Sequence, residues 1–128
     1  MYLRVISLFC CLLLNLIQIM NWLLLIIAGL FEVAFAFCLG KAKFVSKDIA
    51  MYWYAGFVVC LIISMLLLVK ATQTLPIGTA YAVWTGIGAA GTALLGILVF
   101  KDPASFWRVF FLITLIGSVV GLKTITPS

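Results

Sequence analysis

One acidic residue, Glu32, lies inside a long apolar stretch and is the first candidate for chemistry. The stretch from Asn21 to Leu39 holds no other charged residue. A charge at the centre of a membrane helix opposes insertion by roughly 2.5–3.5 kcal/mol, so such residues are usually functional. No Lys or Arg lies at the depth of Glu32 in the other apolar stretches, so the carboxyl lacks an obvious counter-ion. Such a carboxyl can hold a proton or an organic cation, and exchange between the two is the basis of antiport. The structural alternative is a protonated Glu32 that only bridges two helices.

The neighbours of Glu32 on its helical face are small or aromatic. Residues three or four positions apart share one face of a helix, which places Gly29 one turn before Glu32 and Phe35 one turn after it. Gly29 leaves space beside the carboxyl, and Phe35 offers an aromatic edge. We therefore expect both residues to line a site at Glu32.

Polar side chains in two other apolar stretches could complete a cation site. Tyr81 and Trp84 are three residues apart and therefore lie on one helical face. The face of an aromatic ring attracts a cation, and a Tyr hydroxyl can bond a carboxylate. Ser64 is a further possible partner. The structural alternatives are an interfacial aromatic belt and a Ser bonded to its own helix.

Enzymatic, metal and nucleotide chemistry are not expected. The chain has no His, and its four Cys residues show no CxxC spacing, which argues against a metal site or a nucleophile–base pair. The run from Gly86 to Gly91 reads GxGxxG, but it lies inside an apolar stretch instead of between a strand and a helix. We therefore expect that the protein is not an enzyme and binds no cofactor. For the exchange at Glu32, the expected coupling ion is the proton.

The composition indicates a membrane protein. Of the 128 residues, 67% are hydrophobic and 9% are charged, whereas a soluble domain has about a quarter charged residues. The net charge of +5 comes from Lys and Arg residues at the ends of apolar stretches, where they anchor spans and set topology, so nucleic-acid binding is not expected. The protein is predicted to be a multi-pass component of the cell membrane.

Four apolar stretches have the length that a hydrocarbon core of roughly 30 Å requires. A segment that spans lipid must satisfy its own backbone hydrogen bonds, and no alternating pattern of a barrel strand is visible. We therefore predict an all-α integral membrane protein, a bundle of four transmembrane helices, over about residues 21–39, 51–69, 77–100 and 105–122.

Residues 1–19 form an apolar leader before the four-helix domain of residues 20–128. The leader resembles the hydrophobic region of a signal peptide or a fifth span. No cleavage site of the Ala-x-Ala type follows it, and Asn15 and Gln18 interrupt the apolar run. The preferred interpretation is that Met20 is the true start, and whether the leader belongs to the mature protein stays open.

Glycines in the third and fourth stretches predict close helix packing. Gly86 and Gly88 lie in the third stretch, and Gly117 and Gly121 lie four residues apart in the fourth. Small residues at such spacing let membrane helices approach and associate. The packing could occur within one chain or between two chains.

Three segments of the chain resemble the small multidrug resistance family. They run from Asn21-Trp22 to Glu32-Val33, from Thr74 to Gly88, and over the ending Gly121-Leu122-Lys123. The form Trp84-Thr85-Gly86-Ile87-Gly88 is most similar to the guanidinium-exporter branch. The resemblance covers Met20 to Ile125.

The resemblance implies proton-coupled export of small organic cations by a dimer with antiparallel subunits. It implies that Glu32 is the shared proton and substrate site and that Tyr81, Trp84 and Ser64 bond around it. Phe35 stands where the guanidinium exporters usually carry Trp, and Phe has no indole N–H. Guanidinium and a small quaternary ammonium ion therefore both remain candidate substrates.

The distribution of positive charge leaves the partner open. Five basic residues fall on the side of the first and third loops, and Lys70 and Lys123 fall on the other side. This bias predicts a preferred orientation, so the chain could form an antiparallel homodimer or pair with an oppositely oriented paralogue. It could also be an obligate subunit of such a pair that is inactive alone, or a non-transporting assembly subunit. An ion channel is not favoured, because no ring of charge or polar filter loop is visible.

Overall fold

Four α-helices follow one another along the chain. The computed structural model describes residues 2–126, and within them the helices are α1 (Tyr2–Ala42), α2 (Lys47–Ala71), α3 (Ile77–Leu98) and α4 (Phe106–Ile125). All four are long and apolar enough to cross a membrane. The predicted fold, an all-helical membrane protein with four spans, is confirmed.

The helix ends carry residues that suit the helix dipole. Lys41, Lys70 and Lys123 lie in the last turns of α1, α2 and α4, and Asp48 lies in the first turn of α2. Cations near a helix C-terminus and anions near an N-terminus are stabilising. Pro76 immediately precedes α3, where its fixed φ and missing N–H favour a helix start. The charged first turn also explains why α2 begins at residue 47, before the apolar stretch that starts at residue 51.

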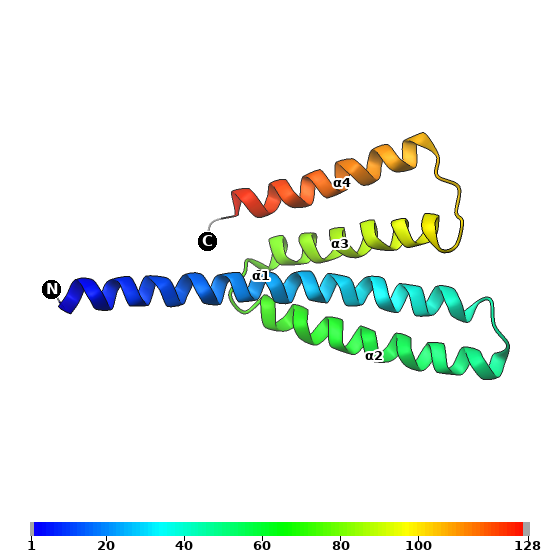
Figure 1. Ribbon diagram of the computed structural model, residues 1–128, viewed down its shortest axis with the longest axis horizontal. Coiled ribbons are helices and arrows are strands. Elements are labelled where there is room, and N and C mark those ends of the chain that lie inside the picture. Colours follow the sequence, from blue (N-terminus) through cyan, green and yellow to red (C-terminus); the bar gives the residue numbers. More distant parts are fainter. Residues whose placement is uncertain (1, 127–128) are drawn as a thin grey trace.

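The first helix is much longer than a membrane is thick. Its 41 residues span about 60 Å at 1.5 Å per residue, against a hydrocarbon core of roughly 30 Å. The leader continues directly into the first span, and its N-terminal half projects beyond the other helices (Figure 1). Side chains 6–17 are all exposed. The packed part of α1 begins with the buried Asn21.

The packed core lies at one end of the bundle. α1 contacts both α2 and α3, whereas α4 contacts α3 and lies at the edge of the bundle opposite α2 (Figure 1). The largest buried cluster comprises Leu25, Ala28, Leu68, Ala71, Leu75, Ala80, Val83 and Trp84. These residues come from the middle of α1, the end of α2, the α2–α3 loop and the start of α3, so the end of the bundle beside this loop is closed by side-chain packing.

A polar contact also ties α1 to the α2–α3 loop. The Asn21 amide donates a hydrogen bond of 2.6 Å to the Thr74 hydroxyl, and Asn21 is 6% exposed. Nearby, the Lys123 ammonium lies 5.5 Å from the centre of the Trp22 ring, a cation–π contact that brings the end of α4 to the same region.

Thr74→Val should destabilise the fold by about 1–2 kcal/mol, because the buried Asn21 amide loses its partner. Thr114→Val is the matched control, since the Thr114 hydroxyl bonds only the Phe110 carbonyl of its own helix. The free energy of unfolding is measured in detergent by circular dichroism during titration with a denaturing detergent. Equal losses for the two variants would contradict the role of this contact.

Candidate functional site

The Glu32 carboxyl packs directly against the backbone of α3 at Gly88. A Cβ atom added at Gly88 would overlap the carboxyl group of Glu32. Gly88 is buried, so no other residue type leaves room for the acid at this crossing. The sequence placed Gly88 among the helix-packing residues, and the structure shows that the group packed against it is the acid itself.

One oxygen of Glu32 is buried without a hydrogen bond. Among the residues that the structure describes, no donor reaches the Oε2 atom of Glu32. Buried polar atoms in folded proteins nearly always have partners, so an exception calls for an explanation. A carboxyl oxygen in this position is available to a bound proton or to the N–H groups of a cation.

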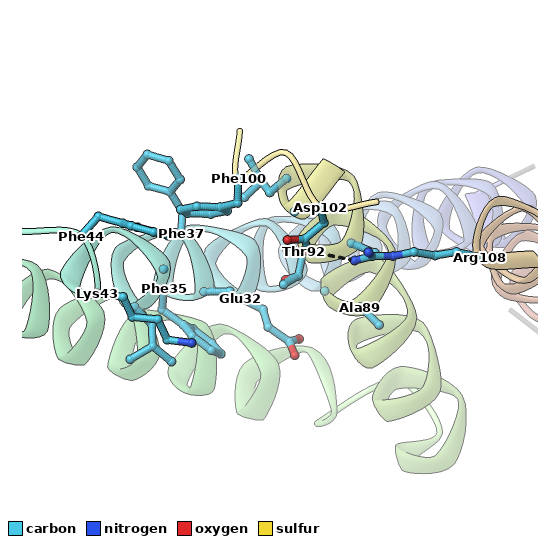
Figure 2. Close-up of a pocket in the computed structure, with 17 residues that line it drawn as sticks. Glu32, Phe35, Phe37, Lys43, Phe44, Ala89, Thr92, Phe100, Asp102 and Arg108 are labelled. Carbon is cyan, nitrogen blue, oxygen red and sulfur yellow. Dashed lines mark hydrogen bonds and ion pairs between the residues drawn. The ribbon is translucent and has the colours of Figure 1, made fainter. Parts of the chain in front are cut away.

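Glu32 lines a cavity of about 710 Å³ (Figure 2). The lining continues from Glu32 to the α1–α2 and α3–α4 loops, where Lys43, Phe44 and Asp102 are exposed, and this loop end is the open end of the cavity. Two rows of small or polar residues at four-residue spacing form facing walls. On α1 the row is Glu32, Ala36 and Gly40, and on α3 it is Gly88, Thr92 and Gly96. The cavity therefore lies along the α1–α3 crossing, with its packed end at the core described above.

Aromatic rings form much of the remaining wall. The rings in the lining belong to Phe35, Phe37, Phe44 and Phe100. Phe35 is held edge-on against Phe57 of α2, with ring centres 5.5 Å apart, and Phe44 stacks on Phe100 at 6.0 Å. Because aromatic faces attract cations, this wall suits a small positively charged molecule better than an anion.

Three charged residues lie at the open end of the cavity. They are Lys43, Asp102 and Arg108, and the last two form an ion pair of 3.1 Å. The sequence predicted Lys and Arg residues at span ends to be anchors and topology signals, and it indicated no role for Asp102. The four-residue spacing of small residues on α1 and α3 was the signal that could have revealed the cavity leading to them.

Ser64 and Trp84 bond each other and the backbone of α1. The Trp84 indole N–H donates to the Ser64 hydroxyl at 3.1 Å, and that hydroxyl donates to the Ala28 carbonyl at 2.8 Å. All three residues are buried. The chain of bonds fixes α2 and α3 against α1 one turn before Glu32, so these polar groups position the helix that carries the acid.

The other predicted lining residues lie outside the cavity. Tyr81 is 55% exposed and packs on Trp84, with ring centres 5.4 Å apart. Gly29 is buried where α1 meets α3, and a Cβ there would fall 2.7 Å from Ile87. Of the residues predicted to line the site, Glu32 and Phe35 line the cavity, whereas Gly29, Ser64, Tyr81 and Trp84 do not. Direct substrate contact by these four stays a prediction.

The glycines predicted to pack helices fall into two groups. Gly86 is buried where α4 crosses α3, and a Cβ there would overlap Val119. Gly117 and Gly121 lie on α4, and among the described residues nothing lies within 4 Å of a Cβ built at either. Gly86 and Gly88 thus serve packing within the chain, and Gly117 and Gly121 lie on a surface.

Comparison with known proteins gives concordant matches. The sequence model of the family described as Small Multidrug Resistance protein matches residues 20–116. The chain is 42% identical over 107 residues to the "Probable guanidinium efflux system subunit GdnD" of Bacillus licheniformis, covering 84% of this chain and 100% of that relative. It is 42% identical over 108 residues to the "Guanidinium exporter" of Salmonella typhimurium, covering 81% and 96% of the two chains. A Bacillus subtilis relative described like the first is 39% identical over 107 residues, covering 84% and 99%.

Ser64→Ala should lower the free energy of unfolding by about 1–3 kcal/mol, because the buried Trp84 N–H then has no acceptor. Ser118→Ala is the matched control, since the Ser118 hydroxyl bonds only the Thr114 carbonyl of its own helix. Denaturation monitored by tryptophan fluorescence measures both variants. A Ser64 variant as stable as the Ser118 variant would show that this network does not hold the three helices together.

Proposed function

The chain belongs to the small multidrug resistance family, and from this premise we propose that it exports small organic cations in exchange for protons bound at Glu32. Membership makes it a multi-pass efflux transporter of the cell membrane and not an enzyme. The coupling ion, the substrate and the mechanism are the proposal.

The observation that carries the proposal is the buried, unbonded oxygen of Glu32 at the inner end of a cavity. An ionised carboxyl in such a place needs a positive partner. A cation that enters from the loop end can supply it, and a proton can supply it when the cation has left. Because one carboxyl accommodates one of these guests at a time, binding of either favours release of the other.

The walls of the cavity suit a small cation with an apolar face. Guanidinium is planar, carries N–H groups that match a carboxylate, and stacks on aromatic rings. Glu32 offers the carboxylate, and Phe35 offers a ring beside it. We propose guanidinium as the substrate class, in line with the printed names of the relatives. A small quaternary ammonium ion is the alternative, because it uses the Phe rings without needing N–H acceptors.

We propose that the working unit is an antiparallel dimer. None of the residues of α4 is buried, and Gly117 and Gly121 present a face without side chains. Small residues of this kind allow close approach of a second membrane helix. Two inverted copies would supply the inverted repeat that larger transporters encode in one chain.

A heterodimer with a paralogue is the second candidate. Two relatives are named as subunits of an efflux system, and the basic residues of this chain are concentrated on one side of the membrane. A chain with a fixed orientation needs an oppositely oriented partner to form an antiparallel pair.

Glu32→Gln should reduce proton-driven guanidinium uptake into proteoliposomes to the level of empty vesicles. The amide keeps the shape of the side chain but can neither ionise nor bind a cation by charge. Uptake is followed with radiolabelled guanidinium under an imposed pH gradient, and tetramethylammonium is tested in parallel. Unchanged uptake by this variant would refute the exchange at Glu32. Uptake by the native chain that requires a co-reconstituted paralogue would select the heterodimer.

Gly88→Ala should weaken guanidinium binding by roughly fivefold or more, because overpacking of about 1–3 kcal/mol displaces the Glu32 carboxyl. Gly78→Ala is the matched control on the same helix, since among the described residues nothing lies within 4 Å of its Cβ position. Isothermal titration calorimetry in detergent measures both dissociation constants. Equal affinities in the two variants would contradict the placement of the acid against Gly88.

A further inference from the structure

The open end of the cavity contains a second carboxylate that already holds a guanidinium group. Asp102 and Arg108 line the same cavity as Glu32, and the Arg108 Nη2 atom lies 3.1 Å from the Asp102 Oδ2 atom (Figure 2). Lys43 is the third charged side chain of this end. A cation that enters from the loops therefore meets this group of charges before it reaches Glu32.

The α3–α4 loop is folded so that the Asp102 carboxylate lies over Gly96. Lys101 has a φ of 57°, a conformation uncommon for residues other than Gly. This conformation of Lys101 turns the backbone back toward the end of α3, so that the Asp102 N–H donates to the Gly96 carbonyl at 2.9 Å. A Cβ on Gly96 would fall 2.6 Å from the Asp102 Oδ2 atom. The missing side chain at Gly96 thus lets the carboxylate sit against the cavity wall.

Arg108 is held by Asp102 but is not locked in place. Its Nη1 atom also donates to the Pro103 carbonyl at 3.3 Å. The side chains of Arg108 and Asp102 are 34% and 45% exposed, respectively. Ion pairs that water reaches are weak, generally worth about 0–1 kcal/mol. The structural contribution of this ion pair is therefore small, and its main effect at the mouth is on the local charge.

The charge at the mouth also depends on Asp102. Lys43 and Arg108 carry positive charge, which repels a cationic substrate, and Asp102 cancels one of the two. Charges lining a cleft with low-dielectric walls strongly affect the rate at which charged ligands enter. Loss of the Asp102 charge would leave two uncompensated cations on the path to Glu32.

We propose that Asp102 controls access to the cavity: its carboxylate cancels one of the two positive charges at the mouth, so that cations can pass Lys43 and Arg108 on the way to Glu32. This inference rests on the proposed export of cations. It assigns to Asp102 and Arg108 control of access, and leaves proton exchange to Glu32.

Asp102→Asn tests the proposal, with Asp48→Asn as the matched control. Asp48 is exposed at the start of α2, at the same end of the bundle and outside the cavity, so both variants remove one negative charge from that end. Initial rates of guanidinium uptake in proteoliposomes give KM and kcat. At an ionic strength of about 0.01 M we expect KM to rise at least about threefold for Asp102→Asn, with kcat unchanged. The increase should shrink at about 1 M, where the Debye length falls from about 30 Å to about 3 Å.

Arg108→Gln and the double variant Asp102→Asn/Arg108→Gln separate charge from structure. Removing Arg108 alone leaves Asp102 free and should lower KM. The double variant has the native net charge at the mouth, so its KM should return toward the native value although the ion pair is gone. A double variant as impaired as Asp102→Asn would show that the pair only holds the loop, and would overturn the proposal.

The experiment distinguishes failure of this inference from failure of the proposed function. If native protein transports guanidinium and Glu32→Gln does not, but Asp102→Asn has the same KM as Asp48→Asn, the mouth site is wrong and the export proposal stands. If native protein shows no guanidinium uptake that depends on Glu32, the export proposal itself fails.

Discussion

A carboxyl group placed within a membrane opposes insertion by roughly 2.5–3.5 kcal/mol, and the interior of this bundle is arranged around that one group. Gly88 has no side chain at the point where the carboxyl of Glu32 lies. Beside it a cavity opens, and within the described part of the chain no donor satisfies the buried oxygen. A structural acid would be expected to have its partner built into the fold. The buried oxygen without a partner is therefore the link between the packing of α1 and α3 and the proposed exchange at Glu32.

The two ends of the bundle differ in a way that gives the cavity a direction. α1 takes part in both, because Leu25 and Ala28 belong to the packed core and Ala36 and Gly40 line the cavity. Glu32 lies at the boundary between the two regions. At the closed end, the Ser64–Trp84 bond and the Asn21–Thr74 bond join helices that would have to separate for a cation to leave on that side. The apolar cluster around Leu25, Leu68 and Trp84 packs at the same end, so opening this end requires separating both the polar bonds and that cluster. A cavity that is open at one end and packed at the other fits the proposed alternating access, in which Glu32 is exposed first to one side of the membrane and then to the other.

The spans could be predicted from the sequence, and so could the place of one acid inside a span, because both depend on local properties. Hydropathy detects the stretch that lies in lipid, and a lone charge in that stretch identifies Glu32. Helix ends are predicted less accurately from hydropathy, because residues outside the lipid can stay helical, as Lys47 and Asp48 do at the start of α2. Contacts between helices are harder to predict. The sequence offered Ser64 and Trp84 as partners around the acid, and in the structure they bond each other and α1, while their contact with a substrate stays a prediction. The approach of Asp102 to the cavity depends on the backbone of Lys101, which no local pattern reveals.

The fourth helix raises the question of what its surface is for. Exposed apolar side chains need no protein partner in a membrane, since lipid is as apolar as Leu, so the absence of buried residues in α4 is not by itself a sign of an interface. The glycines of α3 and α4 give a stronger indication of an interface. Gly in a helix is less favourable than Ala by about 1 kcal/mol. At Gly86 this cost is offset, because the Val119 side chain occupies the position that a Cβ would take. At Gly117 and Gly121 nothing among the described residues makes use of the space. A second helix approaching closely along this face would use it, and this reasoning supports the proposed dimer.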